Sequence, residues 1–272
     1  MPELPEVETY RRFLEETALF QTVTHVFVED RKLLTTDYDT LSRALVGNQF
    51  TGTHRVGKNL FVRTRTDAVL TLHFGMTGSL AYFRDAEDTP RFARVIFSFS
   101  NGFKLGFLCP RKFERVGLTE DIAGYLRAKK LGKDALDTDA ADLARTFRTK
   151  KAPIKPVLLD QSTLAGLGNW IVDDVLFLAG VHPERVAASL TEAETARIHA
   201  AIREVLLTAI DREAVYSRFP AHFLIHARAW DTSPHADPER HLHCPRCAAK
   251  VEKDYVGGRA TYFCSSCQPA QP

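Results

Sequence analysis

The second residue of the chain is a proline whose backbone nitrogen could act as a nucleophile. If Met1 is removed, Pro2 carries a free secondary amine, and such an amine condenses with an aldehyde to give an iminium ion that stays cationic. Because this ion withdraws electrons from neighbouring carbon atoms, Pro2 is a candidate covalent catalyst. A simpler interpretation is that Pro2 only precedes a helix, in whose first turn the dipole favours Glu3 and Glu6.

Four of the five cysteines form two CxxC pairs near the end of the sequence. Cys244 and Cys247 precede residues 248–263, and Cys264 and Cys267 follow them. This spacing is typical of tetrahedral zinc, and the intervening stretch is long enough for one β-hairpin, so we predict a structural zinc ribbon. Four thiolates leave no open position for a catalytic metal. Disulfides are the alternative, which a reducing compartment disfavours.

The predicted hairpin contains Gly257-Gly258-Arg259, which we expect at or near its turn. A rigid hairpin would project the guanidinium of Arg259, and the two-pronged guanidinium suits a phosphate better than an ammonium group does. The fifth cysteine, Cys109, has no partner in sequence and is expected to be an ordinary buried thiol.

Length and composition favour a globular protein of two domains. The chain has 272 residues, 44% of them hydrophobic, which is more than one core usually holds. No apolar run is long enough for a membrane helix, and no export signal begins the sequence, so we expect a cytoplasmic protein. The net charge is only +2, but basic residues cluster at 145–155 and 240–272, as phosphate-binding or merely solvated surfaces do.

The pattern of the chain changes near residue 131. Residues 3–19 have helical periodicity, and short alternating runs with turn signals between them (23–28, 60–64, 69–74, 95–99 and 103–108) follow. Beyond residue 139 the period is helical again, and Thr191 with Glu194 predicts the start of a longer helix. We therefore predict an α+β fold: an N-terminal helix plus antiparallel β-sandwich, then a helical domain and a C-terminal zinc-ribbon β-hairpin. The expected bounds are an N-terminal domain at 1–130, a linker at 131–138, a helical domain at 139–238 and a zinc finger at 239–272.

Several motifs occur in one order along the whole chain. The chain begins MPELPEVE, has Lys58 within RVGK, and continues with HFGMTGSL at 73–80, PRKF at 110–113, IKPVLLDQ at 154–161, GLGN at 166–169 and the two CxxC pairs. In these motifs and their order the sequence resembles the formamidopyrimidine-DNA glycosylase and endonuclease VIII family of base-excision repair enzymes. Its start is closer to the formamidopyrimidine branch.

The resemblance implies a helix/two-turn/helix DNA-binding domain beside the sandwich, with double-stranded DNA carrying a damaged base in the cleft between them. It implies a glycosylase that also cleaves at the abasic site by β,δ-elimination. Pro2 would attack C1′ and form a Schiff base with the opened sugar, while Glu3 would protonate the ring oxygen. Lys58 would contact phosphate and serve in elimination. Arg259 would lie at the phosphate that leaves in δ-elimination.

Further residues match the family's DNA contacts. The damaged base must be flipped out of the duplex and the gap filled, and Met76 and Phe113 would supply the apolar filling; without the resemblance both would be assigned to the core. Asn169, at an expected helix start, suits a phosphate. The residues expected to contact DNA are Met76, Arg111, Phe113, Lys151, Lys155 and Asn169.

The chain also departs from the family pattern. Trp170 follows GLGN where isoleucine is usual, and Asp174 replaces a glutamate. Phe92-Ala93 occurs near the second sheet of the sandwich, where the family often has His-Asp, and Cys109 replaces an aspartate. Residues 215–243 match neither the Gly-rich lesion-covering loop nor the Tyr-Gly-Arg segment of the formamidopyrimidine branch. Oxidised purines (formamidopyrimidines and 8-oxoguanine) are expected first, then hydantoins and oxidised pyrimidines. Opposite-base preference and the balance of β- and δ-elimination stay open.

A second function class is a damaged-DNA or abasic-site binding protein of the same fold with reduced or lost excision activity. The retention of Pro2, Glu3, Lys58 and Arg259 favours the enzyme, because a protein that only binds DNA would not need all four. We expect a monomer that holds one structural zinc ion.

Overall fold

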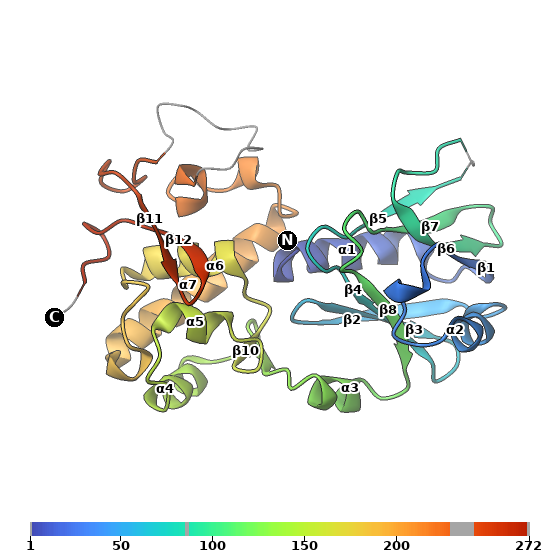
Figure 1. Cartoon of the computed structure of the whole chain (residues 1–272), viewed down its shortest axis with the longest axis horizontal. Coiled ribbons are helices and arrows are strands. Elements are labelled where there is room, and N and C mark those ends of the chain that lie inside the picture. The colour runs from blue at the N-terminus through green and yellow to red at the C-terminus, as the bar shows by residue number, and fades with distance from the viewer. Residues whose placement is uncertain (1, 85–86, 229–241, 271–272) are drawn as a thin grey trace. The chain divides into compact units, whose positions relative to one another are not determined.

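The computed structural model describes residues 2–84, 87–228 and 242–270. The chain divides into two compact units, unit 1 at residues 1–130 and unit 2 at residues 131–272 (Figure 1). Within the described ranges, no helix has both the length and the apolar character needed to cross a membrane. The predicted boundary between residues 238 and 239 lies outside the described residues.

Unit 1 is built on two four-stranded sheets in which every pairing is antiparallel. One sheet has the order β1-β6-β7-β5 and the other β2-β3-β4-β8. Their strands are β1 (Val23–Val28), β2 (Phe50–Val56), β3 (Asn59–Thr64), β4 (Val69–His73), β5 (Ser79–Phe83), β6 (Ala93–Phe99), β7 (Lys104–Leu108) and β8 (Arg115–Thr119). This arrangement is the predicted antiparallel sandwich.

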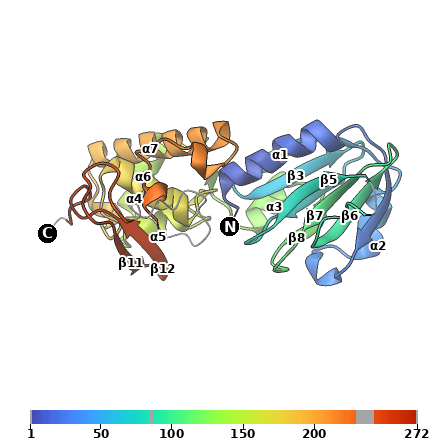
Figure 2. The ribbon, with the colours of Figure 1, turned by 90° about the horizontal axis from the view of Figure 1, so that it is seen from above.

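One helix covers edges of both sheets. α1 (Leu4–Ala18) packs against β2, β3 and β5, and Figure 2 shows it from above beside β3. Its apolar residues recur at helical spacing, so that Val7 and Leu14 are fully buried in the sandwich core and Tyr10 packs on Phe74 with ring centroids 4.6 Å apart. Helical periodicity and one-sided burial together place the start of α1 against the sandwich.

Shorter helices complete unit 1. They are η1 (Arg31–Leu33), α2 (Tyr38–Leu45) and α3 (Ile122–Ala128). Asp37 caps α2 by accepting the Thr40 N–H at 2.9 Å. α3 buries none of its residues, which explains why periodicity does not reveal it.

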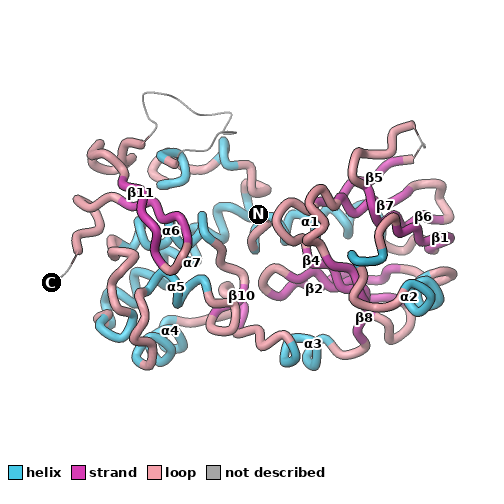
Figure 3. The backbone as a smooth tube through the Cα atoms, in the orientation of Figure 1, coloured by secondary structure: helices cyan, strands magenta, loops and turns pink. Residues whose placement is uncertain are grey.

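Unit 2 is mainly helical, as the tube in Figure 3 shows. Its helices are α4 (Ala140–Arg148), α5 (Ile154–Leu159), α6 (Asn169–Ala179), η2 (Ala187–Ser189), α7 (Glu192–Asp211), η3 (Tyr216–Arg218) and η4 (Leu224–Ala227). α6 is almost wholly buried and packs on α5, α7 and η4. Thr191 and Glu194 form the predicted capping box at the start of α7, with the Thr191 N–H 2.7 Å from the Glu194 carboxylate.

Two small sheets finish unit 2. β9 (Lys133–Asp134) pairs in parallel with β10 (Leu164–Ala165), so part of the predicted linker at 131–138 contributes a strand to unit 2. β11 (Glu252–Val256) and β12 (Arg259–Phe263) form the antiparallel hairpin expected between the cysteine pairs. β12 packs against α6, which ties the hairpin to the helical part of the unit.

Candidate active site and metal centre

The start of α1 holds the candidate nucleophile and its acidic neighbour. Pro2 is buried, and Glu3, the N-cap residue of α1, is only 2% exposed. Glu3 and Glu6 form a reciprocal capping box in which the Glu3 N–H donates to the Glu6 Oε2 at 3.0 Å. The backbone that carries Pro2 is therefore held by the helix end, and a buried carboxyl group lies on the next residue.

Arg55 connects α1 to the hairpin that carries Lys58. Its Nε lies 3.1 Å from the Glu8 Oε2, and its Nη1 donates to the Gly57 carbonyl at 3.1 Å. Gly57 and Lys58 form the two-residue turn between β2 and β3, where the φ of +57° at Gly57 suits glycine. Although burial raises the pKa of Glu8, the hydrogen bonds and charges of Arg11 and Arg55 outweigh it and lower that pKa. An ionised Glu8 thus keeps Arg55, and through it the Lys58 turn, attached to α1.

Lys58 belongs to a cluster of cations that the sequence reveals only in part. Burial, followed by the charges of Lys58, Lys129 and Arg115, lowers the pKa of His73. His73 is therefore neutral near pH 7, and its Nδ1 accepts the Gly75 N–H at 3.3 Å. The backbone of His73 pairs with Asn59, which directly follows Lys58, and with Arg115, so two of these cations come from strand ends beside His73. His73 begins the HFGMTGSL motif and Arg115 follows PRKF closely, so the motifs themselves held the signal.

The three predicted gap-filling residues come together on two adjacent loops of unit 1. Met76 is 39% exposed and Phe113 50% exposed. Arg111 is also exposed, and its guanidinium lies 5.2 Å from the centre of the Phe113 ring. Two large apolar side chains held in solvent by neighbouring loops are unusual in a core but suit insertion into a base stack.

A buried carboxyl group lies beneath these loops. Glu114 has no exposed surface, and the Thr77 hydroxyl donates to its Oε1 at 3.3 Å. Because Thr77 follows Met76 and Glu114 follows Phe113 directly, this hydrogen bond links the two loops. Sequence reasoning did not single out Glu114.

In unit 2 the predicted DNA contacts differ in exposure, from exposed Lys151 through half-buried Asn169 to fully buried Lys155. Asn169 is the first residue of α6, with Gly168 rather than Asn169 as the N-cap, and its Nδ2 donates to the Ala260 carbonyl at 2.8 Å. Lys155 has no exposed surface and forms an ion pair with Asp173 at 2.6 Å. A direct DNA contact by Lys155, as the resemblance implies, would need exposed surface that this side chain does not have.

Arg259 has the position expected of a projecting guanidinium. It is exposed, and it follows the turn residues Gly257 and Gly258, whose φ values are +58° and +74°. A Cβ at Gly257 would lie 2.9 Å from the Cβ of Pro156, so the turn approaches α5 closely. Glycine is required there both by the backbone conformation and by the close approach.

The first described residues of the stretch 215–243, which departs from the family pattern, contact Trp170. The ring centroid of Trp170 lies 5.5 Å from that of Tyr216 and 5.7 Å from that of Phe219. The centroids of Phe219 and Phe223 are 6.0 Å apart. The bulky Trp170, which replaces the usual isoleucine, thus has aromatic partners from residues 216–223. Three of these aromatic residues lie at the start of the stretch 215–243.

The unusual Asp174 also contacts this stretch. It is fully buried, and its Oδ1 accepts the Ile225 N–H at 3.2 Å, at the start of η4. Burial raises the pKa of Asp174 to about 8, and the charge of Arg228 opposes this shift only in part. Asp174 is thus a structural group that caps a turn of the chain.

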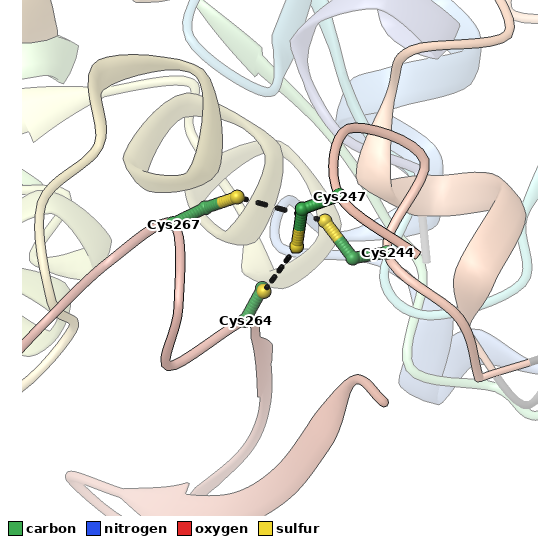
Figure 4. Close-up of side chains that lie close together, drawn as sticks. All are labelled: Cys244, Cys247, Cys264 and Cys267. Atoms are coloured by element: carbon green, nitrogen blue, oxygen red, sulfur yellow. Dashed lines mark hydrogen bonds between the residues drawn. The ribbon is translucent and has the colours of Figure 1, made fainter. Parts of the chain in front are cut away.

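The four cysteines converge on one point, as Figure 4 shows. Their sulfur atoms all lie within 4.8 Å of one another, with the Cys244 and Cys267 sulfurs 3.8 Å apart and those of Cys247 and Cys264 3.5 Å apart. A tetrahedral ion with Zn–S bonds of about 2.3 Å separates its sulfurs by about 3.8 Å. A disulfide requires about 2.05 Å, so the arrangement fits a metal and excludes the disulfide alternative.

Cys109 is buried and lies outside this cluster. Burial and then the charge of Glu114 raise the pKa of its thiol to about 12. It is the inert thiol that the sequence predicts.

Comparisons with known proteins agree with this geometry. Residues 1–116 match the formamidopyrimidine-DNA glycosylase N-terminal domain, and residues 131–220 match the formamidopyrimidine-DNA glycosylase H2TH domain. The formamidopyrimidine-DNA glycosylases of Latilactobacillus sakei and Desulforamulus reducens are both 34% identical to the chain; the matches cover 98% of both proteins in the first case and 100% in the second.

Solved structures give the same result. The Lactococcus lactis formamidopyrimidine-DNA glycosylase bound non-covalently to DNA with an abasic site has a TM-score of 0.88 and 29% identity, covering 99% of this chain and all of that one. The complex of a variant of the Lactococcus lactis protein with DNA containing Fapy-dG has a TM-score of 0.85, again with 29% identity and the same coverage.

The fold and these matches define the class of the protein as a base-excision repair DNA glycosylase. The two matched domains cover most of the sequence, and the chain belongs to the formamidopyrimidine-DNA glycosylase family.

Proposed function

We propose that the chain excises oxidised bases from double-stranded DNA and then cleaves the strand, with the amine of Pro2 as the nucleophile. The observation that carries this proposal is the start of α1, where Pro2 is buried next to Glu3, a carboxyl group with only 2% exposure. A general acid must lie within hydrogen-bond reach of its proton acceptor. A carboxyl group tethered one residue from the nucleophile is suited to that role at the sugar ring oxygen.

Each step of the proposed reaction has a residue suited to it. The Pro2 nitrogen forms a bond to C1′ as the bond to the base breaks, and Glu3 protonates O4′ as the ring opens to the iminium ion. Ionised Glu3 would then take a C2′ proton as the C3′–O bond to the 3′ phosphate breaks, and loss of the C4′ proton in a second elimination would break the C5′–O bond to the 5′ phosphate. Lys58 and Arg259 would neutralise the phosphates involved, Lys58 with the cations near His73 and Arg259 from the hairpin turn.

The same proposal assigns the remaining sites. Met76, Arg111 and Phe113 would fill the gap left by the flipped base, and Lys151 and Asn169 would contact the DNA backbone. The cysteine cluster would hold one structural zinc ion, since four thiolates at this spacing suit zinc. We expect a cytoplasmic monomer.

Formamidopyrimidines and 8-oxoguanine are the first proposed lesions. A Lactococcus lactis relative forms a complex with DNA containing Fapy-dG, and a MutM structure contains DNA with carbocyclic 8-oxo-G. Because residues 215–243 match no Gly-rich lesion-covering loop, hydantoins and oxidised pyrimidines follow as candidates. A panel of duplexes that each carry one defined lesion, assayed for base release, ranks them.

Borohydride trapping tests the covalent step. Reduction of the iminium ion joins the chain to an abasic-site duplex, and we expect a crosslink that mass spectrometry of the digest assigns to Pro2. A chain with an additional residue before Pro2 is the control, because the nitrogen is then an amide and should give no crosslink. Binding of the duplex without any crosslink by the correctly processed chain would instead indicate the DNA-binding protein.

A further inference from the structure

Lys155 is a cation without exposed surface that contacts two other elements of unit 2. Its Nζ donates to the Asp173 Oδ1 at 2.6 Å and to the Ala260 carbonyl at 3.0 Å. Lysine is almost never fully buried unless it is paired. These bonds join three separate parts of the chain, because Lys155 comes from α5, Asp173 from α6 and Ala260 from β12.

Asp173 of α6 also contacts the hairpin directly. Its Oδ2 accepts the Tyr262 N–H at 3.2 Å and lies 3.3 Å from the Arg228 Nη1. The Arg228 guanidinium in turn lies 4.8 Å from the centre of the Tyr262 ring. Both oxygens of one buried carboxylate are thus used, one toward Lys155 and the other toward β12 and Arg228.

The two residues of β12 held in this way, Ala260 and Tyr262, lie one and three positions after the exposed Arg259. Ala260 directly follows Arg259, and its carbonyl accepts hydrogen bonds from both Lys155 and Asn169. On the other side of Arg259, the Gly257 turn rests against Pro156 of α5. The backbone of Arg259 is therefore fixed at both ends, while its side chain remains in solvent.

We propose that Lys155 and Asp173 are positioning residues, which hold β12 in the place where the Arg259 guanidinium meets the departing phosphate. This inference rests on the proposed function of Arg259. A displacement of about 1 Å at such a group can lower a rate about 100-fold, so a rigid support for a long, exposed side chain has a direct effect on the elimination step. Burial in a low-dielectric interior makes these charged hydrogen bonds strong and directional.

The rival role for Lys155 is the direct DNA contact implied by the resemblance. The two roles predict different effects of a Lys155 substitution when Arg259 is truncated. A residue that acts only by placing Arg259 has no further effect once Arg259 is truncated, whereas an independent phosphate contact adds its own loss. A double-mutant cycle therefore separates them.

The experiment compares Lys155→Met, Arg259→Ala and the double variant. Methionine keeps the volume of the lysine stem, and Arg228 remains beside Asp173, so the variant leaves no isolated buried charge. The measured quantities are the ratio of δ- to β-elimination product on an abasic duplex and the dissociation constant for a duplex with an uncleavable abasic analogue. We expect Lys155→Met to lower the product ratio at least about 10-fold, and to change the affinity of the Arg259→Ala background by less than about two-fold.

A matched control and a separate readout complete the test. Lys133→Met removes a lysine from an exposed ion pair with Asp142 in the same unit and should leave both quantities as in the wild type. Hydrogen exchange should show faster exchange of residues 259–263 in Lys155→Met than in Lys133→Met. The proposal would be overturned if Lys155→Met weakened DNA binding equally in the wild-type and Arg259→Ala backgrounds. It would also be overturned if the folded Lys155→Met variant had the product ratio of the wild type.

Borohydride trapping of the wild type keeps this inference distinguishable from the proposed function. A wild-type chain that is not trapped contradicts the Pro2 chemistry, whatever the cycle shows. A wild-type chain that is trapped, combined with additive effects in the cycle, contradicts only the positioning role. Asp173→Asn gives a second variant for the cycle, since asparagine has nearly the same shape but lacks the charge that Lys155 and Arg228 face.

Discussion

Gly75 lies so close to Phe113 that a Cβ atom on Gly75 would come within 2.7 Å of the Phe113 carbonyl carbon. Gly75 also has a φ of +55°, a conformation that side chains disfavour. The loop that carries Met76 and the loop that carries Phe113 are therefore packed backbone to backbone. Since the Thr77 hydroxyl also donates to Glu114, Met76 and Phe113 each have a neighbour that contacts the opposite loop.

Gly75→Ala should separate these two loops. The left-handed backbone alone costs about 1–2 kcal/mol with a side chain, and the overlap with the Phe113 backbone adds roughly 1–3 kcal/mol. We expect a lower melting temperature and weaker binding of an abasic-analogue duplex. Gly47→Ala is the control, because Gly47 also has a positive φ but no atom within 4 Å of its Cβ position. Equal effects of the two substitutions on DNA binding would contradict the role of loop packing.

Met76→Ala and Phe113→Ala should affect DNA binding much more than stability. Because both side chains are well exposed, each truncation should change the free energy of unfolding by no more than about 0.5 kcal/mol. Stacking of one side chain on a base contributes about 1–3 kcal/mol, so affinity for an abasic-analogue duplex should fall roughly 10-fold in each case. Binding titrations measure this effect. Phe27→Ala removes a ring that is 45% exposed on β1 and should leave the affinity unchanged; a similar loss there would indicate a general surface effect.

The sequence predicts the elements whose patterns are strong. β1 has the bounds expected from the alternation of residues 23–28, and Thr191 with Glu194 marks the start of α7 because a capping box is a local signal. The sequence does not reveal β2, since its burial alternates poorly and its pairing with β3 shifts register between Phe50 and Gly52. A strand with such an irregularity lacks the period of two on which sequence reading depends.

The candidate site divides in the same way. Cys244, Cys247, Cys264 and Cys267 could be assigned from spacing alone, because the chemistry of the site fixes it. The burial of Lys155 could not be foreseen, because its partners Asp173 and Ala260 are distant in sequence and lysine is ordinarily exposed. Motifs identify which residues matter, but only tertiary packing determines which way a long side chain points.

Removal of the metal should destabilise the hairpin of unit 2. We expect one zinc ion per chain by elemental analysis, and a marked loss of thermal stability after treatment with a strong chelator, since ligand formation and folding are coupled. Cys264→Ser removes a ligand with no exposed surface and should abolish stoichiometric zinc. Cys109→Ala alters an equally buried thiol outside the cluster and should retain the metal. Unchanged stability of the metal-free chain would contradict a structural role.

Asp174 should make unit 2 less stable as the pH rises. Burial raises its pKa in the folded chain to about 8 from 3.8. Between these values the folded chain binds a proton that the unfolded chain has lost, so the free energy of unfolding falls with increasing pH, by at most about 1.4 kcal/mol per pH unit. The contribution is fully present below pH 4 and is lost as the pH rises through 8.

Asp174→Asn should remove this dependence while its side-chain oxygen still accepts the Ile225 N–H. Urea unfolding of both proteins at pH 5, 6 and 7, followed by tryptophan fluorescence, measures the difference, since Trp170 is buried in unit 2. All other titrating groups are shared by the two proteins and cancel in the comparison. We expect wild type to lose up to about 3 kcal/mol relative to Asp174→Asn across this range. Parallel pH profiles would mean that Asp174 is ionised in the folded chain, and that the charge of Arg228 outweighs the effect of burial.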